Sequence, residues 1–285
     1  DLFAAIAAAD LPDLLWLGST WLALALVIAG RQHALGVLMH EAVHGHLLAH
    51  RRWGDLISDL CCAWPMHITT AGYRHRHLAH HRHTNGDGDP DWTDMQTPAW
   101  RWPRTRAAAA GLLLADACAL TLPHWLRVAH GWSAWSAWQR PGATHRRACT
   151  ELAGYLAFCA GEAVALTLLG WWDLYLLCWL VPSLTVLNAC IRLRAVSEHL
   201  GLDATGEPTR HVDGAWWERA LIAPCGINIH IAHHRHPSVL WYHLPALHHA
   251  LRDSGAYPPG TQLVPRYLGR GDSVWRRWTT RVVPT

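Results

Sequence analysis

Three short histidine clusters in this chain have the spacing of metal ligands. They read His40-Glu-Ala-Val-His44, His77-Leu-Ala-His80-His81 and His230-Ile-Ala-His233-His234. On a helix, residues three and four apart lie on one face, so each cluster is expected to aim two or three imidazoles at one point. Two HxxHH copies plus an HxxxH exceed chance even in a chain with 23 histidines in 285 residues. The clusters therefore predict metal binding.

The number of histidines predicts two metal ions. A tetrahedral zinc takes three or four protein ligands, so the clusters supply more imidazoles than one ion needs. Imidazole binds iron, zinc and copper, which leaves the metal open on ligand type alone. Soluble di-iron bundles use carboxylates and two Glu-x-x-His frames, whereas Glu41-x-x-His44 is the only such frame near the clusters. A redox metal beside apolar helices favours oxygen chemistry on an apolar substrate.

Two other functions are compatible with part of the pattern. His40-Glu41-Ala-Val-His44 also fits H-E-x-x-H, the zinc protease frame with glutamate as general base, but a single zinc would leave both HxxHH clusters unused. A histidine-rich metal transporter or storage protein would place polar groups inside membrane crossings. The apolar segments contain almost none apart from Glu151, Glu162 and Asn188. The metal content distinguishes these functions. Two irons are expected for the enzyme that uses oxygen, one zinc for the protease, and loosely held metal for the transporter or storage protein.

Composition indicates a membrane-embedded half that carries a polar cap. The chain is 51% hydrophobic and 16% charged, and it has 19 tryptophans. That is too apolar for a soluble enzyme and too polar for a chain wholly in lipid. No run of arginines alternates with aromatics, so no nucleic-acid partner is expected. The eight cysteines form no CxxC pair, and neither a disulfide framework nor a thiolate metal site is expected.

Hydropathy predicts three membrane crossings, at about residues 14–30, 148–169 and 171–193. Each has the length that a bilayer core requires. The last two form a hairpin that turns at residues 170–173. Arginines flank the hairpin's ends and the end of the first crossing but not the hairpin tip, which places all three clusters on the cytoplasmic side.

The remaining segments complete a predicted all-α integral membrane protein of one domain, residues 1–285. The first helix is expected to continue into a cytoplasmic helical cap, residues 33–106 and 194–285, that holds the di-metal site. The apolar stretch 107–122 is expected to be interfacial or re-entrant, since one crossing there would put the third cluster on the wrong side. Residues 2–9 are too short to span, and fit the tail of an earlier crossing or an interfacial turn. Because the chain begins with Asp1, we expect its natural start to lie upstream.

The clusters and their surroundings resemble a known enzyme superfamily. From HEAVHGHL through YRHRHLAHHRHTNGDGDPDW to NIHIAHHRHPSVLWYHLPALH, the chain is similar to membrane fatty acid desaturases and hydroxylases, most closely bacterial desaturase-like members, over about Leu35 to Leu247. The resemblance implies a non-haem di-iron enzyme of the bacterial inner membrane that uses O2 on a fatty acid or acyl lipid. It also implies a separate electron donor, a ferredoxin, rubredoxin or cytochrome with its reductase. Desaturation, hydroxylation and oxidative decarboxylation to a terminal alkene all fit.

The resemblance also implies a ligand set, with no catalytic residue beyond the metal centre. A ninth ligand often follows the last crossing in this superfamily, and His199 in Arg194-Ala-Val-Ser-Glu198-His199 matches its place. Relatives with an asparagine four residues earlier hold a metal-bound water; that position is Ala195 here, and Glu198 or Asn228 could take its role. Carboxylates that support ligand histidines are expected at Glu41, Asp89 and Asp91. The implied ligands are His40, His44, His77, His80, His81, His199, His230, His233 and His234.

An acyl substrate could be held mainly by hydrophobic contact and enter sideways from the membrane. Its tunnel is expected at the cytoplasmic ends of the crossings and in the loop before the second cluster, lined by Trp64, Met66, Val186 and Leu187. Trp64 and Trp100 also fit a plain packing role. His243, His248 and His249 follow the third cluster on an amphipathic stretch and are expected at the surface.

Overall fold

The computed structural model describes residues 10–202 and 207–280. The described residues are mostly helical, with irregular connections and two short parallel strands, β1 (His211–Val212) and β2 (Leu263–Val264). The apolar stretch at residues 2–9 lies outside the described residues. The α-helices are α2 (Leu11–His44), α3 (Arg51–Ser58), α4 (Thr70–His83), α5 (Pro90–Met95), α6 (Arg106–Ala117), α7 (Leu122–Trp132), α8 (His145–Leu169), α9 (Trp172–Tyr175), α10 (Val181–Leu184), α11 (Val186–His199), α12 (Trp216–Leu221), α13 (His230–Arg235), α14 (Leu244–Asp253) and α15 (Val274–Thr279). Short 3-10 or π segments are η1 (Asp59–Ala63), η2 (Trp64–Met66), η3 (Pro98–Trp100), η4 (Ala134–Gln139), η5 (Leu176–Leu180) and η6 (Trp241–His243).

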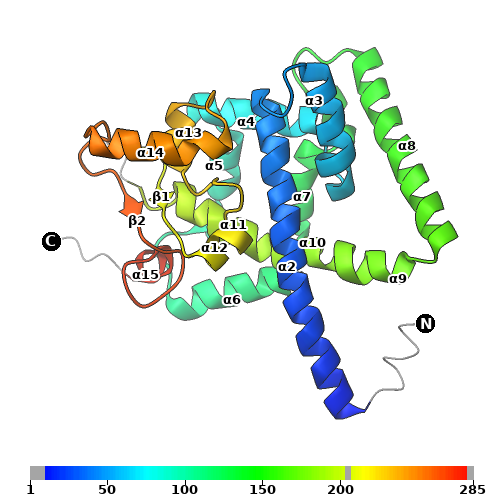
Figure 1. The fold of residues 1–285 in the computed structure, drawn as a ribbon, viewed down its shortest axis with the longest axis horizontal. Coiled ribbons are helices and arrows are strands. Elements are labelled where there is room, and N and C mark those ends of the chain that lie inside the picture. Colours follow the sequence, from blue (N-terminus) through cyan, green and yellow to red (C-terminus); the bar gives the residue numbers. More distant parts are fainter. Residues whose placement is uncertain (1–9, 203–206, 281–285) are drawn as a thin grey trace.

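The longest helix, α2, joins the first apolar segment to the first histidine cluster without a break. It starts where the Asp10 side chain accepts a hydrogen bond from the Asp13 backbone N–H, and it ends at Gly45 in the left-handed conformation (φ 84°). Its N-terminal half is mostly exposed and extends away from the other elements, whereas its C-terminal half is buried among them (Figure 1). The predicted continuation of this helix to His44 is confirmed.

Among the described residues, three helical segments are long and apolar enough to cross a membrane: Leu11–His44, His145–Leu169 and Trp172–His199. None of the most apolar window of α8 is buried inside the protein, and α8 lies along one edge of the molecule (Figure 1). Gly170 (φ 68°) ends α8, and the chain turns there into α9, so the predicted turn at residues 170–173 is present, although α9 runs away from α8 rather than back along it (Figure 1). Such exposed apolar faces suit a lipid environment.

The apolar stretch predicted as one helix over residues 107–122 is instead the first arm of a bent pair. Helix α6 ends at Ala117, and α7 follows at an angle of 63° to it. The Asp116 side chain accepts hydrogen bonds from the Thr121 hydroxyl and the Trp125 indole N–H, and Arg192 of α11 forms an ion pair with it. These buried polar contacts stabilise the bend, which suits a re-entrant or broken span.

Four helices from distant parts of the sequence, α2, α4, α11 and α13, converge in the cap. Helix α2 packs on α4 and α11, and α13 packs on β1 and α14. A core that includes Val37, Leu193 and Val196 lies beneath them. Each of the four carries at least one of the predicted ligands, so the fold positions them at one place.

Candidate metal centre

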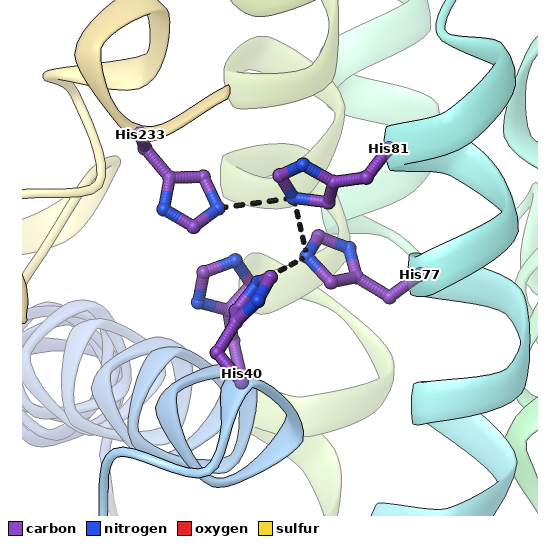
Figure 2. Close-up of side chains that lie close together, drawn as sticks. His40, His77, His81 and His233 are labelled. Carbon is purple, nitrogen blue, oxygen red and sulfur yellow. Dashed lines mark hydrogen bonds between the residues drawn. The ribbon is translucent and has the colours of Figure 1, made fainter. Parts of the chain in front are cut away.

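The nine predicted ligands form two compact groups. The first, called here the five-histidine group, contains His40, His44, His77, His81 and His233. Within it, one ring nitrogen of each residue lies within 4.8 Å of those of the others. Figure 2 shows His77 and His81 extending from one helix toward His40 and His233, which come from two other elements.

The second set, called the four-histidine group, contains His80, His199, His230 and His234, again with one ring nitrogen each within 4.8 Å of the others. His199 comes from the end of α11, so the residue inferred only from its place after the last crossing lies among the others. Both groups are largely buried.

Each HxxHH cluster contributes to both groups rather than aiming all its imidazoles at one point. His77 and His81 lie in the five-histidine group, but His80 lies in the other. The third cluster is reversed, because His230 and His234 lie in the four-histidine group and His233 in the five-histidine group. Residues four apart share a helix face, whereas adjacent residues differ by about 100° in direction. Helices α4 and α13 therefore bridge the two groups.

The inner nitrogens are too close together to be satisfied by hydrogen bonds alone. His77 Nε2 lies 3.1 Å from His44 Nε2 and 2.9 Å from His81 Nε2, and His81 Nε2 lies 3.1 Å from His233 Nε2. A ring nitrogen carries either one proton or one lone pair, so it serves only one such neighbour. His40 Nε2 is buried and has no hydrogen-bond partner among the described residues. A shared cation would accept all these lone pairs.

The spacing also fits a metal coordination sphere. For metal–nitrogen bonds of about 2.1 Å, ligands at right angles around an ion lie about 3.0 Å apart. In the four-histidine group, His230 Nε2 lies 3.0 Å from His199 Nε2 and 3.1 Å from His234 Nε2. The residues present therefore fit a pair of metal ions.

Burial keeps most of these imidazoles neutral, as metal ligation requires. Burial, together with the neighbouring His44 and His80 imidazoles, lowers the pKa of His81 to about 3. Burial and the adjacent imidazoles also hold the pKa of His77 and His233 well below the ordinary value. His80 differs, because burial acts to lower its pKa but the hydrogen bond to Asp89 and nearby carboxylates outweigh burial and raise it.

Two of the expected carboxylates hold the outer nitrogen of a ligand histidine. His80 Nδ1 donates to Asp89 Oδ2 at 2.9 Å, and His40 Nδ1 donates to Glu41 Oε1 at 3.3 Å. Asp89 also caps α5 through the Asp91 backbone N–H, and the Asp91 carboxylate accepts a hydrogen bond from Arg76. Contacts of this kind fix the ring orientation of a ligand histidine.

The other two expected residues, Glu198 and Asn228, have different surroundings. Glu198 accepts a hydrogen bond from Arg194 Nε at 2.7 Å, and its Oε2 lies 3.6 Å from His230 Nε2. Asn228 instead donates from Nδ2 to the Val212 carbonyl. Only Glu198 therefore lies against the inner nitrogen of a candidate ligand.

An apolar cavity of about 120 Å³ adjoins the four-histidine group. His80, His199 and His230 form part of its wall, and much of the rest is aromatic or aliphatic, including Tyr73, Trp100, Trp125, Trp132, Val128 and Ile191. The cavity offers an apolar group direct access to the candidate metal positions.

The residues predicted to line a tunnel do not line this cavity. Val186 and Leu187 pack with residues of α2, Met66 packs beside both α2 and η1, and Trp64 contacts Phe158 of α8. Trp100, also compatible with simple packing, forms part of the cavity wall. That tunnel stays a prediction.

Sequence reasoning missed several residues at the site. Tyr73 stacks on His77 with ring centroids 5.2 Å apart, and Arg194 pairs with Glu198 four residues later. The helical spacing of Arg194 and Glu198 was a usable signal.

A further histidine cluster involves a residue expected at the surface. His248 of α14 is buried and stacks on His211 at 4.0 Å between ring centroids. His211 Nε2 donates to Asp213 Oδ1 at 3.0 Å, and His248 Nδ1 hydrogen bonds with Tyr257. These contacts attach α14 to β1.

The chain is similar to one known protein family over most of its length. No match to the chain is found among curated proteins. The pattern that defines the fatty acid desaturase family matches residues 19–264, which include all nine histidines and both groups. Since the match covers most of the chain, this protein belongs to the fatty acid desaturase family.

Proposed function

We propose that this protein is a membrane di-iron oxidoreductase that uses O2 to desaturate a fatty acyl chain. Membership of the family supports an oxidoreductase acting on a lipid substrate. One observation supports a two-metal site most directly. The nine imidazoles form two groups, and within each group neighbouring inner nitrogens lie about as far apart as adjacent ligands of one metal ion. Hydroxylation and oxidative decarboxylation are the alternatives within the same family.

The proposed ligands of one ion are the five-histidine group and those of the other are the four-histidine group. When bound, two iron ions would supply the oxygen activation needed to remove hydrogen from an unactivated methylene. Desaturation converts CH2–CH2 to CH=CH and consumes one O2, two protons and two electrons to give two waters. The electrons come from a separate donor.

The residues around the groups have two further roles in this proposal. Asp89 and Glu41 hold His80 and His40 in the ring orientation that presents Nε2 inward. The aromatic cavity wall excludes water beside the four-histidine group and binds acyl methylenes at about 0.8 kcal/mol each. Few polar anchors are then needed to place the chain.

The zinc protease alternative is disfavoured by the position of Glu41. A general base must reach a metal-bound water, but the two Glu41 oxygens contact the outer nitrogens of His40 and His46. The backbone N–H of Trp241 also donates to this carboxylate. Glu41 therefore supports ligands rather than facing the metal positions.

We further propose that the active site is on the cytoplasmic side of a bacterial inner membrane. The C-terminal ends of α2 and α11 and the N-terminal end of α8 are flanked by arginines, while the tip at Gly170 is not. This distribution follows the positive-inside rule.

The direct test is turnover of acyl substrates by the purified protein in detergent. It would receive Fe(II), a ferredoxin, its reductase and NADPH, with free fatty acids, acyl thioesters and phospholipids offered separately. Mass spectrometry should detect loss of two hydrogens from one substrate class; gain of oxygen or loss of CO2 would identify an alternative reaction. Absence of any acyl product from protein carrying two irons would refute the proposal, and His80→Ala provides the inactive control.

A further inference from the structure

The two histidine groups are unequal in their number of donors. One contains five imidazoles and the other four. Both are largely buried, and both include residues of the same two helices, α4 and α13, which contribute three imidazoles each. If both ions have similar coordination, the four-histidine group lacks one protein donor.

Glu198 lies beside the four-histidine group, against the inner nitrogen of one of its imidazoles, although its carboxylate is not within 4.8 Å of all four nitrogens. Its Oε2 is 3.6 Å from His230 Nε2, the same nitrogen that lies 3.0 Å from His199 Nε2 and 3.1 Å from His234 Nε2. Glu198 is 4% exposed, and it borders the cavity beside the group. Its position immediately before His199 on α11 brings both side chains to the same group.

The other acidic side chains at the centre show a different contact. Asp89 and Glu41 accept hydrogen bonds from Nδ1 of His80 and His40, which is the outer nitrogen of each ring. Glu198 instead approaches the inner nitrogen of His230. A carboxylate that only orients a ligand ring contacts the outer nitrogen, whereas one that binds the metal lies among the inner atoms.

The Arg194 side chain leaves one oxygen of Glu198 available. Arg194 Nε donates to Oε1 at 2.7 Å, and within residues 10–202 and 207–280 Oε2 makes no hydrogen bond. A buried carboxylate is costly unless its charge is compensated. Arg194 supplies one partner, and a cation beside His230 would supply the other. Nine neutral imidazoles bring no negative charge to two cations, so one carboxylate would also reduce the charge concentrated there.

We propose that Glu198 is a direct oxygen ligand of the metal held by the four-histidine group. This inference rests on the proposed function only in requiring that both groups bind metal. It gives the two ions different donor sets, five nitrogens for one and four nitrogens with one oxygen for the other.

The test compares Glu198→Gln with Glu162→Gln, a matched change on α8 outside both groups, after loading each purified protein with 57Fe. Mössbauer spectra of the wild type should show two distinct iron sites in equal amounts. Glu198→Gln should change the quadrupole splitting of one site and leave the other unchanged, because only one donor set loses a carboxylate. Glu162→Gln removes a carboxylate that contacts neither group, so both sites should keep their spectra. Glu198→Asp, which keeps the charge but is one methylene shorter, should change the same site.

Chelator resistance gives a second readout. A chelator should remove the affected iron from the Glu198→Gln variant at least about tenfold faster than from the wild type, while the second iron stays bound. Unchanged spectra and unchanged iron loss in both Glu198 variants would overturn the inference. Fewer than two irons in the wild type would instead contradict the proposed function, so the two failures are distinguishable. If Glu198→Gln does not fold, Glu198→Asp decides.

Discussion

At the scale of single residues, the loss of one ligand histidine is serious where no adjacent histidine can take its place. His233 links α13 to the five-histidine group, and His80 links α4 to the four-histidine group. Neither has an adjacent imidazole free to replace it, because His234 and His81 already belong to the opposite groups.

We expect His233→Ala and His80→Ala each to lose about one of the two metal ions and all measurable turnover. Metal content by mass spectrometry and product formation would be measured on the same preparations. His236→Ala, which changes a histidine outside both groups, serves as the control and should keep both properties. Full activity in either ligand variant would contradict the proposed ligand set.

A pH effect is predicted for Asp59, a carboxyl outside the membrane-spanning segments. Burial raises its pKa from 3.8 to about 6, although it accepts a hydrogen bond from the Thr70 backbone N–H. The folded protein binds this proton more tightly than the unfolded chain does, so protonation of Asp59 contributes to the free energy of unfolding. This contribution is complete below about pH 4 and is lost as the pH rises through about 6.

Asp59→Asn keeps an acceptor for Thr70 and removes the charge. The variant should match the wild type near pH 4 and exceed it near pH 8 by up to about 3 kcal/mol, the value of two pKa units. Thermal unfolding in detergent across this pH range would measure the difference. Asp87→Asn, at an exposed position, should show no such change. A stability gap that does not vary with pH would argue against a buried charge at Asp59.

At the scale of elements, helix α4 approaches α7 too closely for a side chain at Gly72. A Cβ there would lie 2.3 Å from the backbone carbonyl oxygen of Trp132. The same carbonyl accepts a hydrogen bond from the Thr69 backbone N–H, so it fixes the start of α4. Since α4 carries three candidate ligands, its placement sets the geometry of both groups.

Gly72→Ala should therefore displace α4, reduce metal content and destabilise the fold by several kcal/mol. The matched control is Gly36→Ala on α2, where an added Cβ meets nothing within 4 Å. That change should instead stabilise the helix by about 0.5–1 kcal/mol. Equal effects of the two substitutions on unfolding temperature would refute the steric explanation.

The sequence predicted elements well where local patterns decide and poorly where distant contacts decide. The continuation of α2 to His44 followed from an apolar run with only an isolated glycine before the cluster. The bend between α6 and α7 depends on Arg192 reaching Asp116 from another helix. The allocation of His80 and His81 to different groups depends on how α4 lies between α2 and α13. The pairing of His211 with His248 joins residues far apart in the chain.

At the scale of the whole molecule, basic residues lie together in a cleft beside α4. Arg51, Arg74, Arg140 and Arg147 line it together with Glu151. Arg74 and Arg140 form ion pairs with Asp55 and Glu151, whereas Arg51 and Arg147 are exposed. A separate acidic electron donor would be attracted to this surface.

We expect turnover to require an added donor and reductase, with no sustained product from NAD(P)H alone. Turnover should fall as salt rises, since exposed charges are screened over about 10 Å at 0.1 M. Arg147→Glu should raise the KM for an acidic donor several-fold and leave metal content intact. Arg266→Glu, outside the cleft, should have a smaller effect. Several turnovers without any donor would rule out this dependence.

The unbroken helix α2 also has a consequence for the path of the proposed substrate. About ten residues separate Gly30, where the apolar run ends, from His40, which at 1.5 Å per residue is about 15 Å along the helix axis. If the hydrocarbon layer ends near Gly30, as the apolar run predicts, the acyl chain of the proposed reaction must leave the lipid before it reaches the histidines. Each methylene left in water on that path would cost about 0.8 kcal/mol. On this proposal the cap must enclose the chain between Gly30 and His40, and the length of this part of α2 would set how much of the chain enters the protein.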